Sequence, residues 1–161
     1  MADPGKFGYQ HLEIYRRAHD LAVRVHKMTL GLPAFETYEE GSQVRRSSKS
    51  VSALIVEGYA LRKYRDEFLH YLHRALASAD ETKEHLRYLQ DTGSVRVVGE
   101  CSGFASECER LSASIGRFIV GVERDHSRPF YLRAGPNSAG PSGRAENRES
   151  RIENRPRSSG D

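Results

Sequence analysis

The apolar residues of this chain recur at alternating intervals of four and three positions in four separate segments. Residues three or four apart lie on the same side of an α-helix, so each segment has one apolar helical face. In chain order, the four faces run from Ile14 to Met28, Val44 to Gly58, Phe68 to Leu89 and Phe104 to Val122. The one stretch with strand character, 95–98, is too short and isolated to found a sheet. We therefore predict an all-α protein.

Turn-forming residues separate the four segments. Gly31 and Pro33 stop the first helix, and Gly93 stops the third. The run Thr37-Tyr38-Glu39-Glu40 has the spacing of a capping box, which predicts that Thr37 caps the second helix. A short loop over 97–99 precedes the fourth. Four helices with short links predict an antiparallel, up-down-up-down four-helix bundle. The alternative is two helical hairpins that pair only in an oligomer.

The last part of the chain has a different composition. Residues 123–161 hold eight Arg, no Lys and six acids, and they are rich in Ser, Gly and Pro. Such a segment cannot bury enough apolar surface to offset its ordering entropy. We expect the bundle over 1–125 and a disordered tail over 126–161. No apolar run approaches the ~18 residues of a membrane span, and the N-terminus has no signal-peptide core. We therefore expect a cytoplasmic protein without a membrane partner.

Six basic residues fall within 21 positions of the second helix and the turn that follows it. They are Arg45, Arg46, Lys49, Arg62, Lys63 and Arg65. Tyr59 and Tyr64 are interleaved with them, and this combination is typical of a surface that binds phosphates of nucleic acid. Nearby acids and a net charge of only +1 over the first 122 residues favour the alternative, an ordinary solvated face.

No pattern in the chain indicates catalysis. Glu67-x-x-His70 and Glu123-x-x-His126 match the letters of a di-iron bundle site, which uses Glu-x-x-His on two helices. However, His70 points away from its apolar face, and the second pair lies at the end of the last helix. The two cysteines lie seven positions apart on one helix and form no CxxC pair. We expect no catalytic residue, no metal and no cofactor, and hence no enzyme.

A longer pattern covers the second and third helices. It comprises Leu32-Pro33, Glu36-Thr37-Tyr38, Ser42-Gln43-Val44-Arg45-Arg46, Ser50-Val51 and Ile55-Val56-Glu57-Gly58, then Arg62, Glu67, Phe68, Ala75, Ser78 and Glu81. This pattern resembles the four-helix-bundle family encoded within intervening sequences of bacterial 23S rRNA genes. The chain departs from the family at four places. Glu39-Glu40 replaces Gly-Leu, Leu54 replaces Asn, Tyr64 replaces Ser and Ala77 replaces Gly.

The resemblance implies a four-helix bundle that assembles as a homo-oligomer, with a pentamer as the expected number. A related group of proteins is accessory to the reverse transcriptase of diversity-generating retroelements and binds nucleic acid and the polymerase. We therefore expect a non-enzymatic scaffold or accessory that engages RNA, DNA or a reverse transcriptase through the basic residues. The alternative is a purely structural protein-interaction module that binds no nucleic acid.

The resemblance also singles out a set of polar residues and one glycine. They are Gln43, Arg46, Ser50, Glu57, Gly58, Ser78 and Glu81. We expect mainly a structural network, and a binding site is the alternative. Gly58 would let either the chain turn or a neighbouring helix approach, and Glu57 would be a buried carboxylate that needs an Arg or hydroxyl partner.

Several apolar residues widen the helical faces by one column. They are Tyr15, Ala22, Leu54, Leu61, Leu69, Leu76 and Ile119. From the sequence alone they belong either to the core or to a subunit interface, and the resemblance favours the interface.

Overall fold

The computed structural model of the chain describes residues 8–93 and 98–126. Its elements are η2 (Tyr9–His11), α1 (Glu13–Thr29), α2 (Ala34–Tyr38), α3 (Glu40–Ala60), α4 (Arg65–Asp91) and α5 (Val98–His126). The four long helices are those predicted, and the described residues contain no strand. None of the described helices combines the length and apolar character needed to cross a membrane. The predicted tail lies outside the described residues, apart from the last residue of α5.

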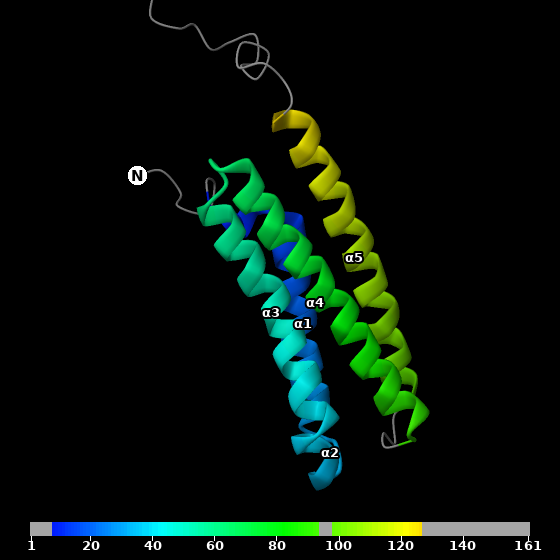
Figure 1. Ribbon diagram of the computed structural model, residues 1–161. Helices are drawn as coiled ribbons and strands as arrows, with labels where there is room; N and C mark the ends of the chain where they lie inside the picture. The colour runs from blue at the N-terminus through cyan, green and yellow to red at the C-terminus, as the bar shows by residue number, and fades with distance from the viewer. Residues whose placement is uncertain (1–7, 94–97, 127–161) are drawn as a thin grey trace, which may run out of the picture. The chain divides into compact units, whose positions relative to one another are not determined.

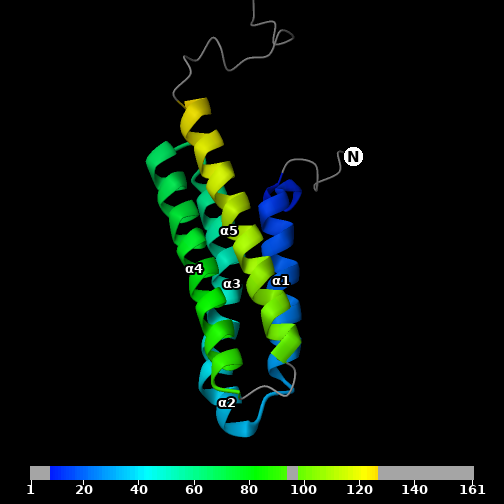
Figure 2. The same cartoon turned by 90° about the vertical axis from the view of Figure 1, so that its right-hand side faces the viewer.

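The long helices run side by side with alternating direction (Figures 1 and 2). Helix α1 runs toward α2, α3 returns, α4 runs back and α5 returns again, as the predicted up-down-up-down order requires. Helix α3 packs against both α1 and α4, and α4 packs against both α3 and α5. Helices α1 and α5 meet over a shorter stretch and close the bundle.

The predicted apolar faces form one continuous core. Each long helix contributes residues with no exposed surface, among them Val25, Ile55, Leu72 and Ile115. Cys108 lies on the buried face of α5, as predicted. Both cysteines are buried, and no disulfide joins them, as their spacing on one helix predicts. Removal of these apolar side chains from water is the main term that stabilises the bundle.

The residues that widen the faces are divided between core and surface. Ala22, Leu54, Leu69 and Ile119 are buried within a single chain, whereas the other three are half-buried. The four buried residues belong to the core of one bundle. They therefore provide no argument for a subunit interface.

Polar side chains tie α1 to α5. The two Nη groups of Arg24 donate to the two carboxylate oxygens of Glu107, with 2.9 Å between Nη1 and Oε1. This hydrogen-bonded pair lowers the pKa of Glu107 below its ordinary value. Arg17 Nη1 donates to Ser114 Oγ at 2.9 Å. The shorter α1–α5 contact is thus closed by charged and polar groups as well as by apolar ones.

The predicted capping box is wrong. Thr37 lies inside α2, where its hydroxyl donates to the carbonyl oxygens of Leu32 and Pro33 at 3.2 and 3.1 Å. No side chain caps α3, which follows Glu39. Because Pro33 starts a short helix, Thr37 takes a helical position and bonds backward to carbonyls, as hydroxyl side chains in helices often do. Helix α5 likewise begins at Val98, inside the predicted loop.

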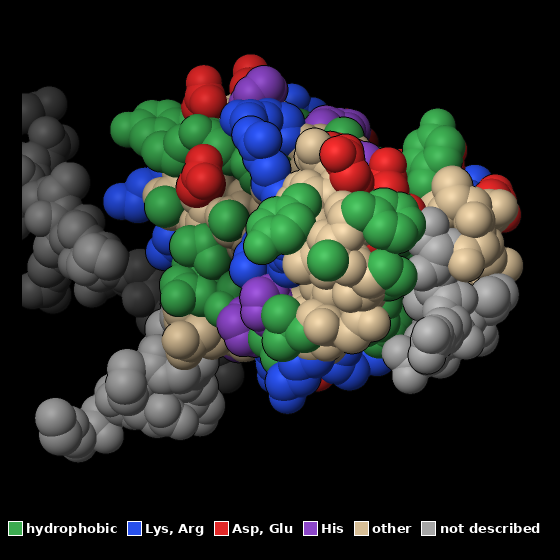
Figure 3. Space-filling view, turned by 90° about the horizontal axis from the view of Figure 1, so that it is seen from below, with side chains coloured by type: hydrophobic (Ala, Val, Ile, Leu, Met, Phe, Trp, Pro, Cys, Tyr) green, Lys and Arg blue, Asp and Glu red, His purple; other side chains and the backbone are tan. Residues whose placement is uncertain are grey.

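The end of the bundle at α2 exposes large apolar side chains. Leu30 is 67% exposed, Phe35 63% and Tyr38 80%. Figure 3 looks at the molecule from this end and shows hydrophobic side chains at the surface among charged ones. These three side chains contribute little to the core of a single chain.

Candidate nucleic-acid interface

The six predicted basic residues do not form one patch. Arg45, Arg46 and Lys49, here called the α3 cations, lie in the first half of α3. Arg62, Lys63 and Arg65, the turn cations, lie where α3 gives way to α4. Arg62 lies sixteen positions after Arg46. At 1.5 Å per residue this corresponds to roughly 24 Å along the helix, so the two groups occupy different regions of the bundle.

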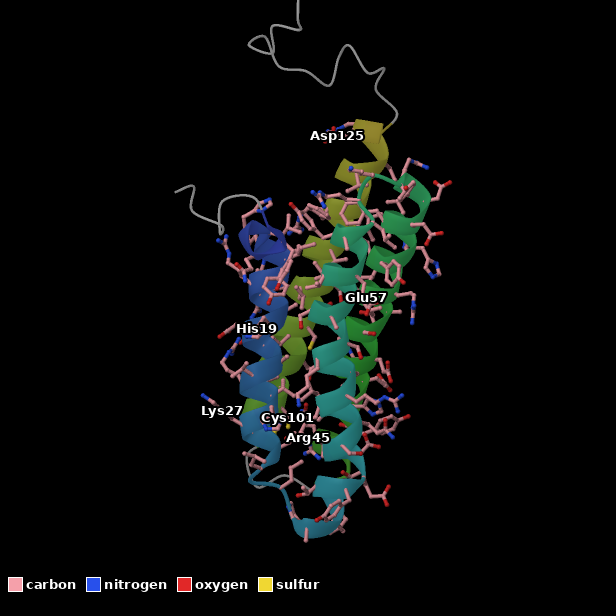
Figure 4. The ribbon with its side chains drawn as sticks, turned by 90° about the vertical axis from the view of Figure 1, so that its left-hand side faces the viewer. His19, Lys27, Arg45, Glu57, Cys101 and Asp125 are labelled. Carbon is pink, nitrogen blue, oxygen red and sulfur yellow. The ribbon has the colours of Figure 1, made fainter. Side chains whose placement is uncertain are left out.

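The α3 cations point to different surroundings. Arg45 is half-buried, and its Nη2 donates to the backbone oxygen of Thr37 at 2.8 Å, which ties α2 to α3. Figure 4 labels this residue near the α2 end. Arg46 is exposed on α3, whereas Lys49 lies beside a groove between α1 and α3. Because Arg45 already donates to a backbone oxygen of its own chain, we assign it a structural role at the α2 end rather than a role in phosphate binding.

The turn cations surround an exposed tyrosine. Helix α3 ends at Ala60, and the backbone N–H of Tyr64 donates to the oxygen of Leu61 at 2.8 Å to close the turn. Tyr64 has extended backbone angles just before α4, and its side chain is 66% exposed. Arg62 and Lys63 are exposed, and Arg65 is half-buried with an ion pair to the exposed carboxylate of Asp66 at 3.1 Å.

A group of rings lies next to this turn. The Arg62 guanidinium lies 4.3 Å from the ring centroid of Tyr59 and donates to the Tyr59 backbone oxygen at 3.0 Å. The rings of Tyr9 and His11 lie 6.5 and 6.0 Å from the Tyr59 ring. The sequence indicated Tyr59 and Tyr64 but missed Tyr9 and His11. Those two residues lie about fifty positions earlier, and only the antiparallel packing of α1 and α3 brings them here.

This end of the bundle combines cations with flat apolar surfaces. Cations attract phosphates without reading sequence, and aromatic rings stack on exposed bases. The acids next to the turn in sequence are Asp66, which pairs with Arg65, and Glu67, which is exposed on α4. Arg62 and Lys63 form no ion pair among the described residues. The turn therefore offers two uncompensated charges beside an exposed ring.

The family-pattern residues gather on the surface between α3 and α4. Ser50, Glu57, Ser78 and Glu81 line one hollow of about 410 Å³, together with Arg74. Gln43 and Arg46 are exposed outside it.

The expectation of a buried carboxylate at Glu57 is wrong. Glu57 is exposed, and within the described part of the chain no hydrogen bond links it to Arg46, Ser50 or Ser78. Figure 4 labels it on α3. Its neighbour Gly58 occupies the buried position of that turn, so Glu57 is rotated toward water.

A buried polar contact between α3 and α4 does exist, but it uses other residues. Thr82 Oγ1 lies 3.0 Å from Ser47 Oγ, and both side chains are about 2% exposed or less. The sequence placed Thr82 on the apolar face and gave no signal for Ser47, because a serine is common on either face of a helix. This pair therefore supplies a buried polar contact between the two helices without any residue of the predicted network.

Helix α4 approaches α3 closely at Gly58. A Cβ atom at this position would lie 2.9 Å from the Cβ of Tyr71 and 3.2 Å from Cδ2 of Phe68. Any larger residue would collide with a part of Tyr71 that cannot rotate away. The prediction that Gly58 permits helix approach is confirmed.

The letters of a di-iron site are not matched by the geometry. Glu67 and His70 are both exposed on α4, outside the core. In the part of the chain that the structure describes, no three His, Cys, Asp or Glu side chains gather as metal ligands would.

The fold and this end together define a small four-helix bundle with a cationic, aromatic turn. The model of the 23S rRNA-intervening sequence protein family matches residues 10–117, more than half of the chain. The protein therefore belongs to that family.

One solved structure is similar to this chain in fold. It is a protein with unknown function from the S23 ribosomal protein family of Bacteroides thetaiotaomicron. The TM-score is 0.58 and the identity 21%, over 66% of this chain and 97% of the other. At this identity the likeness shows the fold alone. No curated protein matches the chain.

Proposed function

We propose that this protein is a non-enzymatic, cytoplasmic, homo-oligomeric bundle that acts as a scaffold or accessory and binds single-stranded nucleic acid at its α3–α4 turn. One observation supports this most directly: Tyr64 is 66% exposed between Lys63 and Arg65. A base stacked on Tyr64 would place its neighbouring phosphates near Arg62 and Lys63. A ring flanked by cations is the usual arrangement in proteins that bind single strands.

One turn offers only a few charges, so a single chain would bind weakly. Each phosphate contact on a single strand contributes about 0.7 to the slope of log K against log salt. A homo-oligomer repeats the turn, and contacts that are weak alone then combine through high effective concentration. From the family resemblance we expect the oligomer to be a pentamer. We expect its partner to be RNA, DNA or a reverse transcriptase.

Fluorescence anisotropy with a labelled 20-nucleotide single strand tests this proposal. The wild-type chain should bind at low salt and weaken steeply as salt rises. Arg62→Glu with Lys63→Glu should weaken binding at least tenfold and flatten the salt slope by about 1.4 per site, since two phosphate contacts are lost.

A matched variant on the same helix provides the control. Arg46→Glu with Lys49→Glu makes the same change in charge at the α3 cations and should weaken binding less than threefold. If this variant loses as much binding as the turn variant, the turn is not the site. If the wild type binds no strand at any salt concentration, the nucleic-acid function is refuted.

The exposed apolar end at α2 favours a second function, a protein-interaction module without nucleic acid. Leu30, Phe35 and Tyr38 expose more apolar surface than a single bundle requires. Under this alternative, Phe35→Glu with Tyr38→Glu abolishes capture of a specific protein partner, whereas the turn variant has no effect on it. Light scattering of the same variant shows whether this end also joins copies of the chain.

A further inference from the structure

A groove between α1 and α3 has an apolar floor and a cationic rim. Its volume is about 310 Å³, and it is lined by His19, Ala22, Val23, His26, Lys27, Lys49 and Ser52. Figure 4 faces this side of the molecule and labels His19 and Lys27 along α1, beside α3. No acidic residue lines the groove. It is separate from the turn cations, which lie beyond the end of α3.

The floor is apolar because two small aliphatic residues of α1 face it. Val23 is 39% exposed and supplies most of this apolar surface, whereas Ala22 is buried and reaches the groove only at its edge. A ligand with an apolar body would remove this surface from water.

The rim carries charge that has no counterpart. Lys27 and Lys49 are exposed and form no ion pair within the described ranges. His26 is half-buried, and its Nδ1 atom is buried without a hydrogen-bond partner. That atom has almost no accessible surface, so the contacts that the rim offers to a ligand are the two lysines.

We propose that this groove binds a small organic carboxylate with an apolar body. The carboxylate accepts a hydrogen bond from Lys49 and lies within the field of Lys27, while the apolar body packs on Val23 beside the edge of Ala22. The volume lies at the lower end of the roughly 300–1,000 Å³ typical of small-molecule sites. A bare anion such as phosphate would leave the apolar floor in water, and a neutral apolar molecule would leave the two lysines without partners.

Three probes separate the parts of this proposal. Octanoate carries both the charge and the apolar chain, acetate carries the charge alone, and octanol carries the chain alone. Calorimetric titration of the full chain at low salt should show saturable octanoate binding. Octanol should bind at least tenfold more weakly, and acetate should not saturate in the same range. Equal affinity for octanoate and octanol, or displacement of octanoate by equimolar acetate, would overturn the proposal.

Two substitutions on α3, one inside the groove and one outside it, test where octanoate binds. Lys49→Gln should raise the octanoate Kd at least fivefold, because a charge-assisted contact is lost. Arg46→Gln removes the same charge from an exposed position of α3 outside the groove and should change the Kd less than twofold. Both residues are exposed, so both variants should fold. An equal effect of the two variants would show that octanoate senses only net charge and would overturn the assignment.

Discussion

Substitution of Gly58 by alanine tests how closely α3 and α4 pack. The new Cβ would lie 2.9 Å from the Cβ of Tyr71, where ordinary contacts are 3.4–4 Å, so the two helices must separate by about half an ångström. A gap of that size forfeits roughly a quarter of each dispersion contact on both sides. Such overpacking costs about 1–3 kcal/mol, and the better helix propensity of alanine returns up to about 1 kcal/mol. We expect a net loss of about 1–2 kcal/mol.

Urea denaturation followed by circular dichroism, at one fixed protein concentration, measures this loss. Gly103→Ala is the matched control. Gly103 is an exposed position of α5 with no atom within 4 Å of the added Cβ. The Gly103→Ala substitution should therefore stabilise the bundle by about 0.5–1 kcal/mol, through the higher helix propensity of alanine alone. If Gly58→Ala stabilises the protein as Gly103→Ala does, α4 does not approach α3 at Gly58 and the packing described above is incorrect.

Further predictions concern the α1–α5 contact and the thiols. Because the hydrogen bond from Arg24 lowers the pKa of Glu107, this pair should stabilise the bundle above pH 4.5, the ordinary value, and lose its contribution as pH falls below it. Both side chains are partly exposed, so Glu107→Gln should cost only about 1 kcal/mol at pH 7 and progressively less as acid protonates the Glu107 carboxylate, measured by denaturation at a series of pH values. A loss that does not depend on pH would contradict the ion pair. Burial raises the pKa of the Cys108 thiol to about 12, so alkylation by iodoacetamide at pH 8 should be far slower in the native protein than in urea. Equal rates in both conditions would show that Cys108 is accessible.

The sequence predicted the fold well because apolar periodicity reports directly on burial. Ile55, Leu72 and Ile115 stand at predicted positions and have no exposed surface. Local turn chemistry was less informative. Thr37 has the spacing of a cap, yet a short helix begins after Pro33, four positions earlier, and Thr37 lies within that helix.

The candidate sites depended on which helices become neighbours, which periodicity does not report. The six basic residues are close in sequence, but a helix of 21 residues divides them between its two ends. Tyr9 joins Tyr59 only through the packing of α1 on α3. Glu57 lies one position from the buried Gly58, and 100° of helical rotation is enough to move its carboxylate from the core to water.

Light scattering behind size exclusion, on the full chain at low salt with and without a 20-nucleotide single-stranded RNA, measures both the oligomeric state and RNA binding. We expect a mass that is a multiple of 18.2 kDa and that increases when RNA is present. The Arg62→Glu, Lys63→Glu variant should keep the same mass without RNA and gain none with it. A wild-type mass that does not change with RNA would contradict nucleic-acid binding, and a mass of one chain would contradict the homo-oligomer.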